Sequence, residues 1–419
     1  MDIIMNIRRA VLFIASILLC GLLFIYALFE RDKEVHQTRE EEKIKVRVLA
    51  CYEIQQEREL LKQLADDFNQ KYQACMVEVE FIDKENLKKD ICLRVDSGEQ
   101  PDIVIGGSME ILGLADMGVL ENVDSLVKEN LYHKLIYPDM WQTTMNNGIY
   151  YGIPFICNPY VLFCNREYLK KLEKPAPHTW EEVLEVCSKS SQKGVYGLSM
   201  GVKRSSDAAT VFNYILYVSG ANYYNLFSES GLGAIEIADI LKRWGYVDKY
   251  CINSTPKDAA EVFREGQSVF LLAPLDTRIW LDHAQTAFKY EIVAAPEKIK
   301  SGYIISGDNL ALLKGAKEEA FQFVEYLYTP QVRDRIVQGT GTLPIFQEEF
   351  KKYDNEGELR LLSDRFIRQG ECLKHYNSWF EISDILSDSL RSLLTKRNFD
   401  LPQMAEVLQD KIRVVIMSN

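Results

Sequence analysis

The feature that most constrains this chain is an alternation of strand-like and helix-like apolar segments near its start. The strand patterns, with apolar side chains at every second position or in a short buried run, are at 46–50, 77–81 and 102–105. The helix patterns between them are at 60–68 and 87–95. Strands separated by helices predict an α/β fold with a parallel sheet and right-handed crossovers.

The same alternation returns in the middle of the chain. Residues 161–163, 195–200 and 268–272 have strand patterns, and the capping box of Thr179 and Glu182 opens a helix at Trp180. The last quarter is predicted to be helical, at 317–328, 331–338, 378–396 and 403–414. Two α/β units that face one another would place a ligand cleft beyond the carboxyl ends of their strands.

The charge balance excludes one class of partner. Lys and Arg total 49 against 61 Asp and Glu, which gives a net charge of −12. An acidic chain lacks the positive field that holds phosphate backbones, so we expect no nucleic-acid partner.

The N-terminus predicts a membrane anchor. Arg8 and Arg9 precede an uncharged apolar run at 10–29, which as a helix would span roughly 30 Å, the thickness of a bilayer core. The paired arginines place the N-terminus inside. We therefore expect an uncleaved transmembrane helix at 1–29, a charged stalk at 30–44, and the rest of the chain outside the cell membrane. Two alternatives remain open, a lipoprotein lipidated at Cys20 and cleavage elsewhere, although Leu19 is large for a lipoprotein site.

Cysteine and histidine spacings give no sign of a metal or cofactor site. None of the nine cysteines forms a CxxC pair, and none of the five histidines has ligand spacing. Most of the cysteines are expected to be buried thiols, and a disulfide cannot be paired from the sequence. No Gly-x-Ser-x-Gly elbow is present, so we expect no catalytic residues, no metal and no cofactor.

Several longer segments resemble bacterial extracellular solute-binding protein family 1, the sugar-binding receptors of ABC importers. The segment from residue 150 reads YYGIPFICNPYVLFCNREYLKKL and is followed by a Thr-Trp-Glu helix start. The positions that fit the family pattern are Tyr151, Gly152, Pro154, Asn158, Leu162, Asn165 and Trp180. Further segments that resemble the family are PDIVIGG, VFREGQSVFLLAP and the stretch from ISGDNLALLKG to GTGTLP. The resemblance covers nearly everything from residue 45 to the end.

This resemblance implies a two-lobed fold of the periplasmic-binding-protein type, with hinge crossovers and a ligand cleft between the lobes. We expect lobe 1 at 45–157 and 298–345, and lobe 2 at 158–297 and 346–419. The crossovers are expected near 155–160, 295–306 and 341–346. One departure affects the ligand: where the family has a Gly-Pro-Trp loop, this chain has Ala273-Pro274-Leu275, and Trp280 follows five residues later.

Sugar binding needs flat rings and a few hydrogen-bonding groups on loops that follow strands. The candidates chosen on this rule are Tyr52, Ser108, Asn158, Tyr223, Asp276, Trp280, Asp308, Asn309 and Trp379. Each also has a structural interpretation. Asn158 suits a turn beside Pro159, Ser108 suits a helix cap, Tyr223 can pack on neighbouring rings, and Trp379 can be buried at a helix start.

The sequence thus predicts a membrane-tethered, monomeric receptor that captures a sugar or oligosaccharide and delivers it to an ABC permease. Three alternatives are kept. The chain could present its ligand to a membrane signalling kinase, it could be an enzyme that acts on extracellular glycans, or it could be a relative that has lost its ligand.

Overall fold

The computed structural model describes residues 21, 25–26, 43–72, 74–129, 132–191, 194–346, 348–349, 357–396 and 400–418. The predicted anchor at 1–29 and stalk at 30–44 fall outside these residues except for positions 21, 25, 26, 43 and 44. Within the described part of the chain, no helix combines the length and the apolar character needed to cross a membrane. The anchor therefore stays a prediction.

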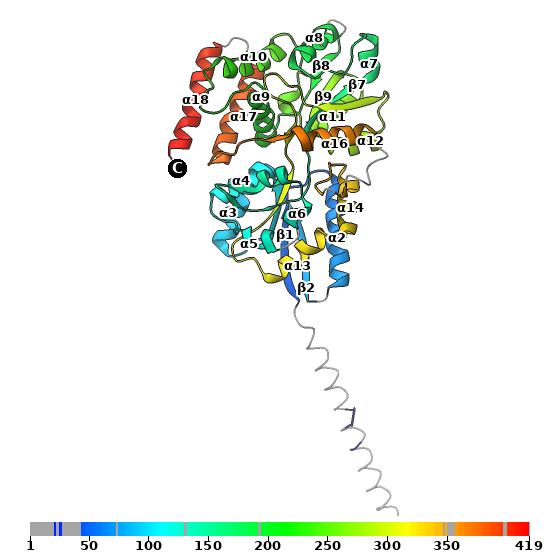
Figure 1. Cartoon of the computed structure of the whole chain (residues 1–419), viewed down its shortest axis with the longest axis vertical. Helices are drawn as coiled ribbons and strands as arrows, with labels where there is room; N and C mark the ends of the chain where they lie inside the picture. Colours follow the sequence, from blue (N-terminus) through cyan, green and yellow to red (C-terminus); the bar gives the residue numbers. More distant parts are fainter. Residues whose placement is uncertain are drawn as a thin grey trace, which may run out of the picture.

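The first lobe is built on a five-stranded sheet (Figure 1). Its strands, in spatial order, are β2 (Cys75–Phe81), β1 (Ile44–Ala50), β3 (Ile103–Gly107), β12 (Asp308–Leu312) and β6 (Ile153–Pro154). Its helices are α2 (Gln55–Lys71), α3 (Leu87–Ser97), α4 (Ser108–Asp116), α5 (Asp124–Glu129), α6 (Tyr132–Leu135), α13 (Glu318–Leu327) and α14 (Pro330–Thr340). Short turns of 3₁₀ helix are η1 (Lys84–Asn86) and η2 (Pro138–Thr144), and the hairpin strands are β4 (Met145–Asn146) and β5 (Ile149–Tyr150).

The second lobe is built on a four-stranded sheet. Its spatial order is β10 (Tyr290–Ala294), β7 (Tyr160–Asn165), β9 (Ser268–Pro274) and β8 (Tyr196–Ser199). Its helices are α7 (Arg166–Lys171), α8 (Trp180–Ser191), α9 (Ser205–Val218), α10 (Glu229–Arg243), η3 (Cys251–Asn253), α11 (Pro256–Arg264), α12 (Thr277–Ala284), α17 (Trp379–Thr395) and α18 (Leu401–Met417). The C-terminal helices thus pack on the middle of the chain, where α17 lies against α9 and α10.

Local sequence explains why these elements form. In α2 the side chains of Leu61, Leu64 and Phe68 recur every three or four residues and are buried against the sheet. The predicted capping box is confirmed, because the Thr179 hydroxyl accepts from the Glu182 amide and the Glu182 carboxylate accepts from the Thr179 amide.

The expectation of parallel sheets is wrong for four of the seven strand pairs in the two main sheets. β1 pairs in parallel with β2 and β3, as the βαβ pattern predicts. However, β12 runs antiparallel to β3 and β6, and β7 runs antiparallel to β9 and β10. β12 and β7 each follow a segment that crosses from the other lobe. They are therefore not bound by the crossover rule that governs a local βαβ unit.

The chain passes between the lobes in three segments that lie side by side. The Asn158 amide donates to the Ser306 carbonyl (2.8 Å), which joins the first segment to the second. The Leu343 amide donates to the Cys157 carbonyl (2.8 Å), which joins the third segment to the first. A β-carbon at Gly307 would lie 2.0 Å from the Ile156 carbonyl oxygen, so the close approach requires glycine there.

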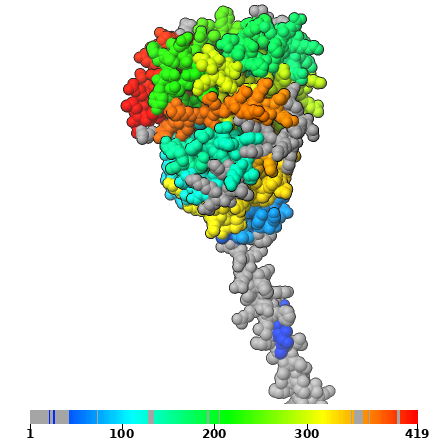
Figure 2. Space-filling model, in the orientation of Figure 1, coloured from blue at the N-terminus to red at the C-terminus, as the bar shows by residue number. Residues whose placement is uncertain are grey.

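Two further elements lie at this waist. Strands β11 (Ile304–Ile305) and β13 (Glu371–Cys372) pair in parallel, and helix α16 (Gly357–Gln369) precedes β13. Figure 2 shows the orange segment that contains α16 lying along the boundary between the two lobes.

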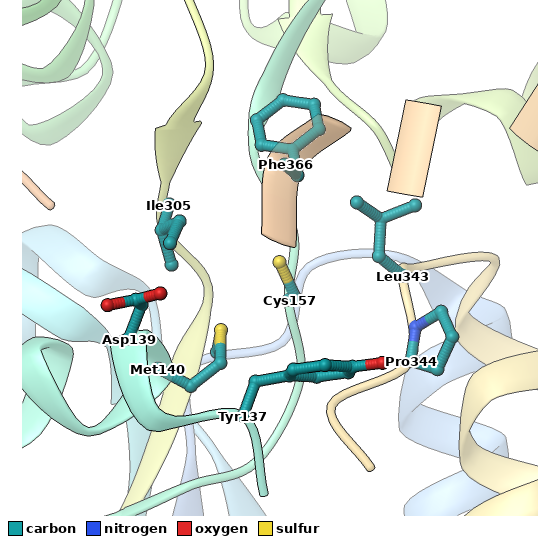
Figure 3. A pocket seen from close by; sticks show the side chains of 8 residues that line it. All are labelled: Tyr137, Asp139, Met140, Cys157, Ile305, Leu343, Pro344 and Phe366. Atoms are coloured by element: carbon teal, nitrogen blue, oxygen red, sulfur yellow. The ribbon is translucent and has the colours of Figure 1, made fainter. Parts of the chain in front are cut away.

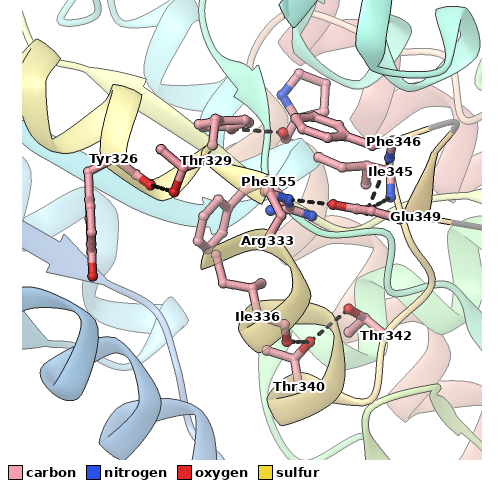
Figure 4. A network of polar contacts seen from close by, with 12 residues as sticks. Phe155, Tyr326, Thr329, Arg333, Ile336, Thr340, Thr342, Ile345, Phe346 and Glu349 are labelled. Atoms are coloured by element: carbon pink, nitrogen blue, oxygen red, sulfur yellow. Dashed lines mark hydrogen bonds and ion pairs between the residues drawn. The ribbon is translucent and has the colours of Figure 1, made fainter. Parts of the chain in front are cut away.

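A buried arginine holds two of the crossing segments together (Figure 4). Arg333 on α14 is fully buried and donates to the Phe155 carbonyl (2.7 Å) and to a Glu349 carboxylate oxygen (3.0 Å). The other oxygen of Glu349 accepts from the amides of Ile345 and Phe346, both at 3.1 Å. We call Arg333 and Glu349, with the backbone groups they bind, the hinge pair.

Candidate functional site

A cleft of about 520 Å³ lies between the lobes, at the carboxyl ends of strands from both sheets. This volume lies within the range of pockets that bind small molecules. The first lobe lines the cleft with the loop after β1 and the start of α2 (51–57), with Lys84 after β2, and with Asp308 at the start of β12. The second lobe lines it with Arg204 and Asp207, residues 255–257, and the segment after β9 from Pro274 to Trp280.

A narrower extension of about 90 Å³ continues from the cleft toward α4 and α17. It shares Lys84, Asn158, Asp207, Pro274 and Asp308 with the main cleft. It adds Ser108, Glu110, Tyr160 and Trp379 among its lining side chains.

The structure brings seven of the nine predicted site residues to these two spaces. Tyr52, Asn158, Asp276, Trp280 and Asp308 line the cleft, and Ser108 and Trp379 line the extension. The Ser108 hydroxyl donates to the Gly307 carbonyl (2.7 Å), so this group is already engaged. Asn158 binds Asp276 twice. Its amide nitrogen donates to the carboxylate (2.7 Å), and its oxygen accepts from the Asp276 amide (3.0 Å).

Two predicted residues lie elsewhere. Tyr223 is 2% exposed within the core of the second lobe, where its hydroxyl donates to Asn213 and its ring packs on Tyr376. Asn309 is fully buried inside β12, and its amide nitrogen donates to the Thr143 carbonyl (2.7 Å). Tyr223 follows a helix rather than a strand. Asn309 follows Asp308 on the strand, so its side chain points to the opposite face.

Apart from Asp276 and Asp308, the charged residues of the site were missed. The structure adds to the cleft and its extension Glu53, Glu57, Lys84, Glu110, Arg204, Asp207 and Lys257. Most of them follow the rule used to choose the candidates. Glu53 and Glu57 come after β1, Lys84 comes after β2, and Arg204 and Asp207 come after β8. The same rule, applied to every residue after each strand, would have included them among many others.

An ion pair joins the two lobes across the cleft. The guanidinium of Arg204, from the second lobe, is paired with the Glu53 carboxylate of the first lobe. The same guanidinium donates to Asp207 through its Nε (2.7 Å). Arg204 therefore has two carboxylate partners, one in each lobe.

Burial raises the pKa values of several cleft carboxyls. Burial raises the pKa of Asp207 to about 6, although the nearby Arg204 opposes the shift. Burial also raises the pKa of Asp276 to about 6 against the Asn158 hydrogen bond, and that of Asp308 to about 6 against Lys84. Burial opposes the charged form of Lys84, but Asp308 and Glu110 outweigh burial and raise its pKa.

Glu57 is the most isolated of these acids. It is 4% exposed, and its Oε1 has no hydrogen-bond partner among the described residues. Burial, followed by the charges of Asp276 and Asp308, raises the pKa of Glu57 well above its usual value. The hydroxyl of Tyr52, 4% exposed on the same side of the cleft, also lacks a partner in the described part of the chain. Buried polar groups are normally hydrogen-bonded, so both atoms have unused binding capacity.

A second hollow lies at the hinge and is far smaller (Figure 3). It measures about 20 Å³ and is lined by Tyr137, Asp139, Met140, Cys157, Ile305, Leu343, Pro344 and Phe366. Its lining is mainly apolar and comes from all three crossing segments. The space is close to the minimum that holds one water molecule, so it is not a ligand site.

Comparisons with known proteins agree with this architecture. The family model described as bacterial extracellular solute-binding protein matches residues 54–334. A putative binding protein of Brucella abortus is 22% identical over 315 residues, which are 71% of this chain and 76% of the relative. The maltotriose-binding protein of Pyrococcus abyssi is 23% identical over 296 residues, which are 65% of this chain and 60% of the relative.

Solved structures share the fold at low sequence identity. The maltose-bound MalE3 of T. maritima has a TM-score of 0.77 at 16% identity, over 89% of this chain and all of that one. A solute-binding protein of Thermotoga lettingae bound to α-D-tagatose has a TM-score of 0.77 at 18% identity, over 90% of this chain and all of that one. The predicted two-lobed architecture is therefore confirmed.

Proposed function

The chain belongs to the bacterial extracellular solute-binding proteins, and from this premise we propose that it captures a sugar or oligosaccharide in the cleft between its lobes. The observation that carries the proposal is the cleft itself. It is large enough for a disaccharide, opens where both sheets end, and has aromatic rings and hydrogen-bonding side chains on opposite walls.

The cleft supplies the two kinds of surface that a sugar needs. Trp280 offers a flat ring for the C–H face of a pyranose, and the buried Tyr52 offers its unpartnered hydroxyl. Asn158, Asp276 and Asp308 offer donors and acceptors for the hydroxyls. The relatives whose names mention maltotriose, maltose and tagatose support a sugar as the ligand class.

We further propose that the chain is tethered outside the cell membrane by its N-terminal apolar run and passes its ligand to an ABC permease. The run at 10–29 and the family's role in import support this proposal. The receptor is proposed to act as a monomer and to bind its ligand without chemical change. Ligand binding would favour the closed arrangement only through contacts made with both lobes at once.

A thermal-shift screen of the full chain in mild detergent tests the binding proposal. The probes are maltose, maltotriose, α-D-tagatose, ribitol and the amino sugars used below. A ligand at 100 times its Kd should stabilise the fold by about 2.7 kcal/mol, and the melting temperature should rise accordingly. Chromatography of the recovered sugar should show no product. If no sugar raises the melting temperature, the proposal fails, and release of a shorter sugar would indicate an enzyme.

A matched pair of tryptophan variants locates the binding. Trp280→Ala removes a ring from the cleft and should lower the affinity at least tenfold. Trp244→Ala removes an exposed ring from α10's C-terminal end in the same lobe and should leave the affinity unchanged. Equal losses in both variants would contradict the assignment of the cleft.

A further inference from the structure

The walls of the cleft carry more negative than positive charge. Among the described residues, the cleft and its extension are lined by six carboxyl groups and three cationic side chains. The carboxyl groups are those of Glu53, Glu57, Glu110, Asp207, Asp276 and Asp308, and the cations are Lys84, Arg204 and Lys257. A neutral sugar leaves this excess to be relieved by protonation of the acids, as the raised pKa values of Glu57, Asp276 and Asp308 indicate, whereas a cation compensates it directly.

The cations are not spread evenly over the acids. Arg204 is taken up by Glu53 and Asp207, through an ion pair and a hydrogen bond of 2.7 Å. Lys84 acts on Asp308 and Glu110 and also on Glu57 and Asp276. Lys257 is exposed at the rim. The excess is therefore shared by acids of both lobes, among them Glu57 in the first lobe and Asp276 in the second.

Independent geometry at Glu57 points to a missing donor. Its Oε1 is buried and has no hydrogen-bond partner in the described part of the chain, although the side chain lines the cleft. Glu57 from the first lobe and Asp276 from the second both line the cleft, so the two acids face a common space. An N–H donor with a positive charge placed there would satisfy the orphan oxygen and compensate both acids.

The distribution of the acids favours an organic cation over a metal ion. Within the described residues, no group of three or more His, Cys, Asp or Glu side chains is arranged to hold a metal ion. The acids line a space of several hundred Å³ instead of converging on one point. The nearby Trp280 ring adds a surface that attracts an organic cation and the C–H face of a sugar alike.

We propose that the ligand of this cleft is a sugar that bears a protonated amine, with the ammonium group held between Glu57 and Asp276. The inference rests on the proposed function, because it assumes that this cleft is the ligand site. It adds the chemical class of the ligand. An ammonium held by one acid from each lobe would also join the lobes, so the charge that selects the ligand would favour closure.

The experiment compares two disaccharides that differ at the 2-position. The β-1,4-linked glucosamine disaccharide carries ammonium groups where cellobiose has hydroxyls. Both are titrated calorimetrically into the full chain in mild detergent at pH 7 and low salt, beside spermidine and maltotriose. We expect the glucosamine disaccharide to bind at least tenfold more tightly than cellobiose, with a preference that weakens as salt is added.

Variants on one helix connect the preference to the site. Glu57→Gln keeps the shape of the side chain and removes its charge, and it should reduce the tenfold preference to twofold or less. Asp66→Asn is the matched control, because it removes one charge from the exposed face of the same helix and should retain the full preference.

The outcomes separate the two proposals. If cellobiose or maltotriose binds as tightly as the amino disaccharide, the ammonium inference is overturned while sugar binding stands. If spermidine binds and no sugar does, the ammonium site is supported and a sugar as its carrier is overturned. If no probe binds, both proposals fail. A preference that survives Glu57→Gln would overturn the assignment to Glu57.

Discussion

The hinge pair and the cleft both bury charged side chains at the waist of the molecule, but they treat the charge differently. At the hinge, Arg333 and Glu349 neutralise one another, and both oxygens of Glu349 accept hydrogen bonds. Arg333 Nη2 has no hydrogen-bond partner among the described residues, but the guanidinium lies over the Phe155, Tyr328 and Phe346 rings. In the cleft, acids outnumber cations and Glu57 has an oxygen without a partner among the described residues. Compensated charge holds the crossing segments together, whereas uncompensated charge marks the place where a ligand belongs.

The largest effect is expected at the hinge pair. Arg333→Met should lower the free energy of unfolding by about 3–5 kcal/mol, because it leaves the Glu349 carboxylate buried without its cation. Urea denaturation of the full chain measures this loss. Arg335→Met on the same helix is the control, because its ion pair with Asp67 is 40% and 47% exposed, and breaking it should cost no more than about 1 kcal/mol. Equal losses would show that burial of the pair does not matter.

Removing a charge from the cleft should not lower the free energy of unfolding as it does at the hinge pair. Glu57→Gln replaces a buried acid, whose pKa burial raises, with a neutral amide, which removes the cost of ionising this group close to Asp276 and Asp308. We expect the free energy of unfolding without ligand to stay the same or to rise by on the order of 1 kcal/mol at pH 7. Urea denaturation of the full chain measures this change in the free energy of unfolding. A loss comparable to that of Arg333→Met would mean that Glu57 is a structural residue.

The pH dependence of the free energy of unfolding tests whether Asp308, an acid of the cleft, is destabilising when it is ionised. Its pKa is raised to about 6, so the folded chain keeps a proton that the unfolded chain loses near pH 4. The stability that comes from this group is therefore complete below about pH 4 and is lost as the pH rises through 6. The charged groups that act on Asp308 are Lys84, Glu110 and Glu53.

Asp308→Asn isolates this contribution. The variant should match the wild type in stability at pH 4 and exceed it by on the order of 1 kcal/mol at pH 7, because the amide cannot ionise. Melting temperatures measured at both pH values test the sign. A variant that is less stable than the wild type at pH 7 would show that the Lys84 interaction outweighs burial.

The smallest effect is expected at an exposed contact between the lobes. Lys88 on α3 is paired with Glu381 on α17 and lies over the Phe380 ring, and the paired side chains are 40% and 47% exposed. Lys88→Met should change the free energy of unfolding by less than about 1 kcal/mol, and 1 M salt should remove most of the difference. A loss of several kcal/mol that persists in salt would show that this exposed contact stabilises the fold as strongly as the hinge pair does.

The sequence predicted elements and architecture well and the chemistry of the site only in part. Helix patterns such as 60–68 and 378–396 predicted α2 and α17, because one buried face imposes its period on the residues. The partners of β12 and β7 could not be predicted, because strand direction after an interlobe crossing depends on where the other lobe sits. In the hinge pair, Arg333 contacts Glu349, which is 16 positions away, and the Phe155 carbonyl, which is 178 positions away. No local sequence pattern encodes these contacts.

The cleft illustrates the same limit. Tyr52, Asp276 and Trp280 were predicted from their places after strands, and they line the cleft. Tyr223 was predicted from a loop after a helix, and it belongs to the core. The charge excess could not be predicted, because 61 acids are spread along the chain and only the fold shows which of them share a cavity.

Hydrogen–deuterium exchange of the full chain shows whether the ligand is bound between the two lobes. It is measured with and without saturating amounts of the sugar that gives the largest thermal shift. The account predicts slower exchange at residues 51–57 and 274–280, on the two walls of the cleft, and little change at residues 137–144, beside the small hinge hollow. Protection confined to one lobe, or centred on the hinge hollow, would contradict a ligand bound between the lobes.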